Sequence, residues 1–250
     1  MLKMSYPSRQ LSIANQLPAA ESARFFGISL KRLDASLLME TMLVMIAAIL
    51  AIKVLGDSSL SKAAWFVAPG ILVAAAIIHT AIRKDEFAKI GFNIKQVRLT
   101  LRVVCWTCAV VFPATLFGLL LLKSYGLNLP LRPVPPQGQA WVGWLLYQFM
   151  YVSVAEEVFF RGYVQNNILK STSTIIKERR RLLQWISIII SAACFAAAHI
   201  IVQGKIISVL IFLPGLILGW LFIRTRSLLA PILFHGLANV YYFSVAAAFV

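Results

Sequence analysis

The stretch SVAEEVFFRGY, residues 153–163, brings Glu156, Glu157 and Arg161 into a run of mostly apolar or small residues that reaches back to Trp141. A charged side chain at the centre of a bilayer costs about 2.5–3.5 kcal/mol on insertion scales. Leaving all three charges in contact with lipid would cost on the order of 8–10 kcal/mol, which is comparable to the stability of a whole domain. We therefore predict that these side chains face protein or water inside a bundle of helices.

The composition of the whole chain is typical of a membrane protein. Of its 250 residues, 60% are hydrophobic and 13% are charged, whereas soluble domains average about 45–50% and about 25%. Segments of about 20 apolar residues, the length that crosses a bilayer, occur at roughly 36–54, 63–82, 103–122, 141–169, 182–202, 206–223 and 228–249. The predicted fold class is all-α, a polytopic transmembrane helix bundle of about seven spans.

The net charge of +15 would be typical of a nucleic-acid-binding protein if the chain were soluble. Here the basic residues alternate between connections, as the positive-inside rule predicts. About 18 Lys and Arg lie in the N-terminal segment and in the second, fourth and sixth connections, against about 4 in the others. We expect an integral multi-pass protein in a lipid bilayer, with no nucleic-acid partner, a cytoplasmic N-terminus and an external C-terminus.

The Pro-rich stretch LPLRPVPPQGQ, residues 129–139, divides the chain, because Pro and Gly oppose helix continuation. We predict a cytoplasmic N-terminal segment at 1–35 without the pattern of a cleavable signal peptide, a three-span region at 36–127, an external loop at 128–140 and a four-helix region at 141–250. The four-helix region holds most of the ionisable residues found within spans. The exceptions, Glu40, Lys53 and His79, lie near span ends, where side chains can reach the interface.

Spacing separates the two adjacent glutamates. Glu157 and Arg161 are four residues apart with the acid first, which favours an ion pair along one helix face. Glu156 is rotated about 100° from Glu157 and has no basic residue at that spacing. Glu156 is therefore the unpaired carboxylate.

Two later spans carry the polar partners that Glu156 could have. His199 ends FAAAH in the fifth span, and His235 and Asn239 in the seventh are four apart and share a helix face. A carboxylate and an imidazole can deprotonate water, and a second imidazole and an amide N–H can donate to an oxyanion. This set suits hydrolysis of a peptide bond. Two alternatives stay open: hydrogen bonds that merely link helices, and zinc bound by one Glu and two His, although H-E-x-x-H is missing.

Three motifs in fixed order, EEVFFR at 156–161, FAAAH at 195–199 and HGLAN at 235–239, resemble those of the CPBP family. These are the CAAX-protease and bacteriocin-processing proteins, also called the Abi family, and they include the type II CAAX prenyl endopeptidases. The resemblance covers roughly residues 140–245 and places the catalytic core in the C-terminal four helices. It implies an intramembrane glutamate protease that requires no metal or other cofactor.

The resemblance also implies roles for individual residues. Glu156 and His199 would activate water, and His235 and Asn239 would stabilise the oxyanion. Glu157, Arg161 and Phe195 would support the site structurally.

The implied substrate is a peptide or protein with a membrane-associated C-terminal region, prenylated or carrying a sorting tail, and the implied location is a bacterial inner (plasma) membrane. The sequence does not select the substrate or the side from which it arrives. A non-enzymatic bacteriocin-immunity or membrane scaffold protein of the same fold would be expected to have lost a catalytic position. A transporter with a proton relay would be expected to show repeats in both halves. Neither expectation is met, so a protease is favoured.

Overall fold

The computed structural model describes residues 34–84, 91, 96–127, 140–173 and 180–249, and every regular element within these ranges is a helix. The predicted all-α fold class is therefore confirmed. The predicted N-terminal segment at 1–35 and the Pro-rich loop at 128–140 lie almost entirely outside the described residues.

Seven helical segments coincide with the seven predicted spans. They are α3 (Ala35–Asp57), α4 (Ser61–Ile82), α5 (Val97–Ser124), a continuous segment from α6 (Ala140–Leu146) to α8 (Asn166–Ser173), α9 (Arg180–Gln203), η5 with α10 (Ile206–Ile211 and Phe212–Thr225) and α11 (Leu229–Phe249). By length and composition, 5 helices in the described part of the chain can cross a membrane: α3, α5, α9, η5 with α10, and α11. Helix α4 contributes a shorter apolar stretch, Phe66–Ile82.

The surface of α3 shows why this bundle belongs in lipid. One face is buried, with Leu37, Met45 and Ile49 at helical spacing. On the opposite face, large apolar side chains such as Leu43 and Val54 are more than half exposed. A contiguous exposed apolar surface of this kind is unusual in a soluble monomer and is expected where a helix meets hydrocarbon. The protein is therefore an integral membrane protein.

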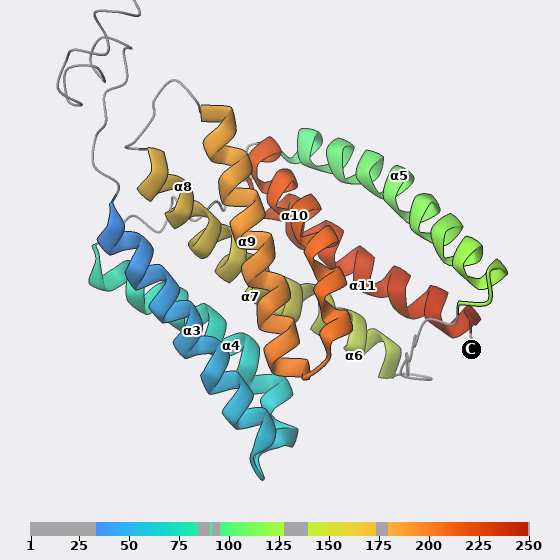
Figure 1. The fold of residues 1–250 in the computed structure, drawn as a ribbon, viewed down its shortest axis with the longest axis horizontal. Coiled ribbons are helices and arrows are strands. Elements are labelled where there is room, and N and C mark those ends of the chain that lie inside the picture. The colour runs from blue at the N-terminus through green and yellow to red at the C-terminus, as the bar shows by residue number, and fades with distance from the viewer. Residues whose placement is uncertain (1–33, 85–90, 92–95, 128–139, 174–179, 250) are drawn as a thin grey trace, which may run out of the picture.

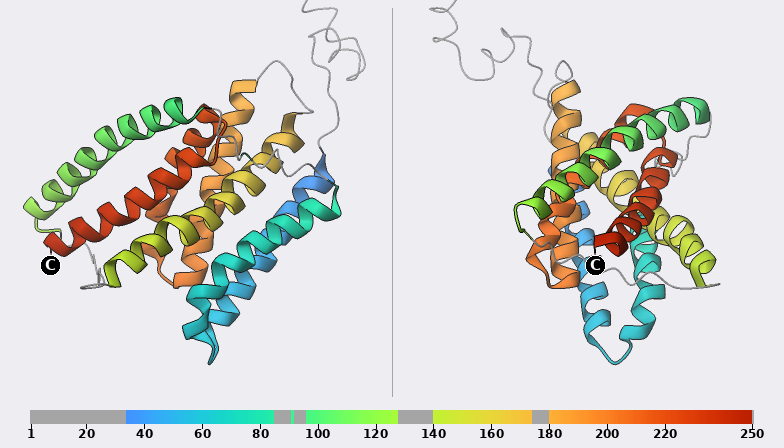
Figure 2. Two further views of the ribbon diagram at one scale, coloured as in Figure 1. Left: turned by 180° about the vertical axis from the view of Figure 1, so that it is seen from behind. Right: turned by 90° about the vertical axis from the view of Figure 1, so that its right-hand side faces the viewer.

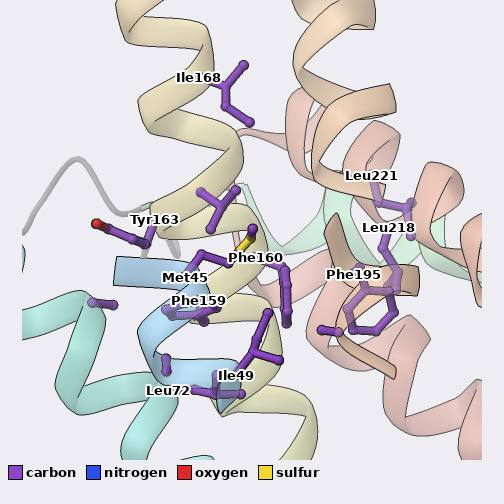
Figure 3. Packing of buried hydrophobic residues seen from close by; sticks show 14 of the residues in the cluster. Met45, Ile49, Leu72, Phe159, Phe160, Tyr163, Ile168, Phe195, Leu218 and Leu221 are labelled. Atoms are coloured by element: carbon purple, nitrogen blue, oxygen red, sulfur yellow. The ribbon is translucent and has the colours of Figure 1, made fainter. Parts of the chain in front are cut away.

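The α6–α8 segment runs through the middle of the bundle (Figures 1 and 2). The α3–α4 hairpin packs against its second half and against α9, and α11 packs against its first half. Helix α5 lies at the periphery, against α11 and α10. Figure 3 shows Phe159 and Phe160 of the central segment between Ile49 and Leu72 on one side and Phe195 on the other. The core therefore joins the N-terminal hairpin to the C-terminal helices.

Helices α9 and α10 approach closely because α10 carries glycine at two positions four residues apart. A Cβ atom added to Gly215 would lie 3.1 Å from the Cβ atom of Ala192, and one added to Gly219 would lie 3.1 Å from Cγ2 of Ile188. Small residues at this spacing let transmembrane helices pack backbone to backbone. The close approach also brings the carbonyl groups of both glycines to the central segment.

Candidate active site

Two π-helical stretches, η2 (Tyr147–Val152) and η3 (Val158–Gln165), flank α7 (Ser153–Glu157) and set which residues of the central segment share a face. The turn is widened locally at Ser153, whose backbone N–H and side-chain hydroxyl both donate to the carbonyl oxygen of Gln148, five residues earlier. In a regular α-helix, two residues twelve positions apart, such as Gln148 and Phe160, would point in directions about 120° apart around the axis. The wider π turns reduce this angular difference, so that such residues can share one face.

The effect is two rows of side chains, each with a four-residue repeat. The first row lines a cavity and consists of Gln148, Val152, Glu156 and Phe160. The second row is buried against α10 and consists of Glu157, Arg161 and Gln165. The adjacent glutamates therefore belong to different environments, one at a cavity and one in the protein interior.

Glu157 is the first residue of the buried row and has no exposed surface. Its Oε1 atom accepts hydrogen bonds from Nη1 of Arg161 at 3.1 Å and from Nδ1 of His235 at 2.8 Å. The ion pair between Glu157 and Arg161 that the spacing predicts is therefore present. His235 is an additional partner, from α11, that local spacing does not reveal.

Arg161 connects three helices. Its Nη2 atom donates to the carbonyl oxygen of Gly215 on α10 at 3.3 Å. Its Cζ atom lies 4.4 Å from the ring centroid of Phe195 on α9, a cation–π contact that is strengthened by the absence of water. Gln165 makes the equivalent bond one turn later, from Nε2 to the carbonyl oxygen of Gly219 at 3.1 Å. These contacts hold the buried row at a fixed position between α9 and α10.

His235 lies between the two glutamates. Its Nδ1 atom faces Glu157, and its Nε2 atom lies 3.7 Å from Oε2 of Glu156. Because a carboxylate can only accept, Nδ1 carries a proton, and Nε2 carries one only when the ring is positively charged. Oε2 of Glu156 has no hydrogen-bond partner among the described residues, and the side chain is 18% exposed. Glu156 is therefore the carboxylate available to a molecule in the cavity.

His199 reaches the same cavity from α9. Its Nδ1 atom lies 2.9 Å from the carbonyl oxygen of Phe195, and its ring meets the Phe195 ring edge to face at 4.5 Å. A carbonyl oxygen can only accept, so Nδ1 is the protonated nitrogen of the neutral ring and Nε2 carries the lone pair. His199 therefore offers a hydrogen-bond acceptor, in a fixed orientation, to the cavity that Glu156 also lines.

Asn239 contacts the cavity through another residue. Its Nδ2 atom donates to Oε1 of Gln148 at 2.9 Å, and Gln148 lines the cavity. With Oε1 occupied, the two N–H groups of Gln148 remain as donors. Gln148 was not among the site residues predicted from the sequence. The feature that could have indicated Gln148 is its polar side chain in a mostly apolar segment, eight residues before Glu156.

The cavity has a volume of about 470 Å³ and lies between α3, α4, the first half of the central segment and α9. Among the described side chains that line it, Glu156 is the one carboxylate, and there is no Lys or Arg. Most of the remaining wall is apolar or small, with Ile52, Ala64 and Ala68 contributed by the hairpin. The N-terminal hairpin thus forms a wall of the site.

All seven residues singled out from the sequence lie in one connected region. Glu156 and His199 line the cavity, Asn239 reaches it through Gln148, and Glu157, Arg161, Phe195 and His235 form the buried layer next to it. Among the described residues, no group of three or more His, Cys, Asp or Glu side chains is arranged to hold a metal ion.

Comparison with known proteins gave one finding. Residues 138–241 match the family model described as type II CAAX prenyl endopeptidase Rce1-like. The searches among curated proteins and among solved structures each gave no match. The matched region runs from just before α6 into α11 and contains the whole cluster described above.

Proposed function

We propose that the chain, whose residues 138–241 match the family model of Rce1-like type II CAAX prenyl endopeptidases, is an intramembrane glutamate protease. The match supports CAAX-type protease activity in general. The proposal adds that the enzyme cleaves a peptide bond near the C-terminus of a membrane-associated substrate. The observation that carries it is that Glu156 and His199, from two different helices, line one cavity inside the bundle.

The first proposed step is activation of a water molecule between these two side chains. The water donates one hydrogen bond to the Glu156 carboxylate and the other to Nε2 of His199, which orients its lone pair toward a substrate carbonyl carbon. Glu156 takes the proton as the C–O bond forms, and returns it to the leaving amine as the C–N bond breaks. General-base assistance of this kind contributes about 10²–10⁴-fold to the rate.

In the proposed mechanism, two donors stabilise the oxyanion of the tetrahedral intermediate. One is the Nε2 amide of Gln148, which Asn239 holds through the hydrogen bond to Oε1. The other is Nε2–H of a protonated His235. In that protonation state His235 and Arg161 balance the charges of the two glutamates, which lowers the cost of burying the cluster. Asn239 thus acts as a positioning residue for Gln148 in this scheme.

Glu156→Gln tests the proposal, because it keeps the shape of the side chain and removes the base. The full-length protein in detergent would be offered apolar fluorogenic peptides with free, blocked and prenylated C-termini, with the cut located by mass spectrometry. We expect the variant to lose about 10²–10⁴-fold in kcat while its melting temperature stays close to that of the wild type.

Glu40→Gln is the matched control, since Glu40 also bonds a His and an Arg but lies outside the cavity. It should retain cleavage. Activity that persists in Glu156→Gln would contradict the proposed base, and activity that a chelator abolishes would favour metal-dependent hydrolysis. A wild-type protein that cleaves none of the peptides would favour the non-enzymatic immunity or scaffold alternative.

A further inference from the structure

The cavity reaches one end of the bundle. Its wall runs along α3 from Ile49 to Gly56, and along α4 from Leu72 to Ser61. At 1.5 Å per residue these paths are about 10 Å and about 16 Å long. Gly56 and Ser61 flank the turn between the two helices, and Gln203, which also lines the cavity, is the last residue of α9. The cavity therefore extends from mid-bundle to the end where α3 meets α4 and α9 meets η5.

The start of α3, the end of α4, the end of α8 and the start of α11 lie together at the opposite end of the bundle. The backbone N–H of Asp34, just before α3, donates to the carbonyl oxygen of Ser171 in α8 at 3.4 Å. Arg83, just after α4, lies 3.8 Å from Asp34. Leu228, just before α11, donates its N–H to the carbonyl oxygen of Gly91 at 2.9 Å. Successive helices therefore run in opposite directions between the two ends of the bundle, as Figures 1 and 2 show.

The two ends differ strongly in positive charge. Among the described residues, nine Lys and Arg lie at or near the helix ends remote from the cavity mouth: Arg83, Lys84, Arg98, Arg102, Lys170, Arg180, Arg181, Arg224 and Arg226. Three lie near the helix ends on the cavity side: Lys62, Lys123 and Lys205. Of the two other described basic residues, Lys53 pairs with Asp57 and Arg161 is buried. Basic connections stay in the cytoplasm, so the cavity end faces away from it.

We propose that the cavity opens on the non-cytoplasmic side of the membrane, and that its substrate is an apolar, membrane-anchored segment of an exported protein presented from that side. The statement about substrate rests on the proposed protease function, whereas the statement about the opening does not. The cavity wall suits such a segment, because among the described side chains that line it Glu156 is the one carboxylate and there is no Lys or Arg. A C-terminus made and prenylated in the cytoplasm would approach the other end of the bundle.

The opening can be tested without any substrate. In the full-length protein, Cys105, Cys108 and Cys194 would be replaced by alanine, and single cysteines introduced by Ser59→Cys in the α3–α4 turn and Lys84→Cys after α4. Both parent residues are exposed. With a membrane-impermeant maleimide on intact cells, we expect Ser59→Cys to react and Lys84→Cys to react only after lysis. The reverse pattern would overturn the proposal.

A third position reports on the cavity itself. Ala64 lies on the cavity wall, and Val67, one helical turn away, lies on an exposed face of α4 outside the cavity. Each would be replaced by cysteine, as Ala64→Cys and Val67→Cys. Because maleimides react with hydrated thiolates, Ala64→Cys should react at least about 10-fold faster than Val67→Cys when the reagent is outside. Equal rates, or reaction of Ala64→Cys only after lysis, would contradict an external opening.

The substrate side is tested with a peptide that the wild type cleaves in detergent. In sealed right-side-out vesicles, external peptide should be cleaved, whereas inside-out vesicles should cleave it only after detergent is added. Cleavage by inside-out vesicles alone would overturn the inference and leave the protease function standing. Absence of cleavage in detergent would instead overturn the protease function and with it the substrate statement, while the labelling result would still decide the opening.

Discussion

The α3–α4 trio, Glu40, His79 and Arg83, and the central trio, Glu157, His235 and Arg161, use the same three side-chain types in the same way. In the α3–α4 trio, Oε2 of Glu40 lies 3.2 Å from Nε2 of His79 and 2.7 Å from Nη1 of Arg83. In the central trio, one oxygen atom of Glu157 likewise receives both a His and an Arg. A carboxylate bridging these two bases is therefore not by itself a catalytic arrangement.

Burial and one further carboxylate distinguish the two trios. The side chain of Glu40 is 42% exposed, whereas that of Glu157 is fully buried. His79 packs edge to face on Tyr163, whereas His235 has Glu156 on its other side, at the cavity. Each ionic trio therefore holds helices together. Chemistry becomes feasible at the central trio because an unpaired carboxylate, Glu156, and a cavity lie beside it.

Arg161→Met should give the largest loss of stability, because it leaves the Glu157 carboxylate buried with one partner fewer. Breaking a fully buried pair costs about 3–5 kcal/mol. We expect a large drop in melting temperature in detergent and low accumulation in membranes. Arg83→Met in the α3–α4 trio should change melting far less, because solvent already screens that pair.

The double variant Glu157→Gln with Arg161→Met separates charge from packing. Removing both charges should recover part of the stability that Arg161→Met alone loses. A double variant less stable than Arg161→Met would show that the packing of Arg161 on Phe195 outweighs the charge. Equal losses for Arg161→Met and Arg83→Met would remove the distinction between the trios.

Local sequence patterns were sufficient for the helices and for part of the site. Apolar length predicted the seven helical segments, and four-residue spacing predicted the pair of Glu157 with Arg161. Each depends on residues close together in one helix, where geometry follows from the helical repeat. The predicted roles of the site residues stay predictions.

Contacts between helices could not be obtained in this way. The sequence suggested that Glu40 and His79 each reach the interface, whereas they bond to each other across two helices. It paired Glu157 with Arg161 alone and did not reveal His235 as a second partner or Gln148 at the cavity. The register of α11 against the central segment, and the π turns that align Gln148 with Glu156, arise from tertiary packing rather than from a local repeat.

Gln148→Met tests the role of the cavity beside the central trio, since it keeps the length of the side chain and removes the amide. If Gln148 donates to the oxyanion, kcat should fall by about 10²–10³ with little change in KM. Asn239→Leu should give a smaller loss, and the double variant should lose no more than Gln148→Met, because Asn239 acts through Gln148. A proportionate rise in KM with unchanged kcat would indicate a role in binding alone.

The smallest effect concerns Asp34, which extends the α3–α4 trio toward water. Asp34 caps α3, and the hydrogen bond from the backbone N–H of Leu37, followed by that from Ser36, holds the pKa of its carboxyl below its ordinary value. A lowered pKa in the folded state stabilises the fold at pH values above the unfolded pKa, about 3.9. This contribution is lost as the pH falls through the folded value.

Melting temperatures of the wild type and Asp34→Ala should therefore differ at pH 7, by the equivalent of about 0.5 kcal/mol. The difference should shrink as the pH falls from about 4 through the lowered pKa of Asp34. Asp34→Asn keeps a side-chain oxygen for the Leu37 N–H and removes the charge, so it should melt between the two at pH 7 and show no such convergence. A difference between the wild type and Asp34→Ala that does not shrink as the pH is lowered would mean that the cap acts through hydrogen-bond geometry and not through charge. The charge of Asp34 would then add no stability at the exposed end of the α3–α4 trio, and the difference in solvent exposure between the two trios would not be seen in the pH dependence of melting.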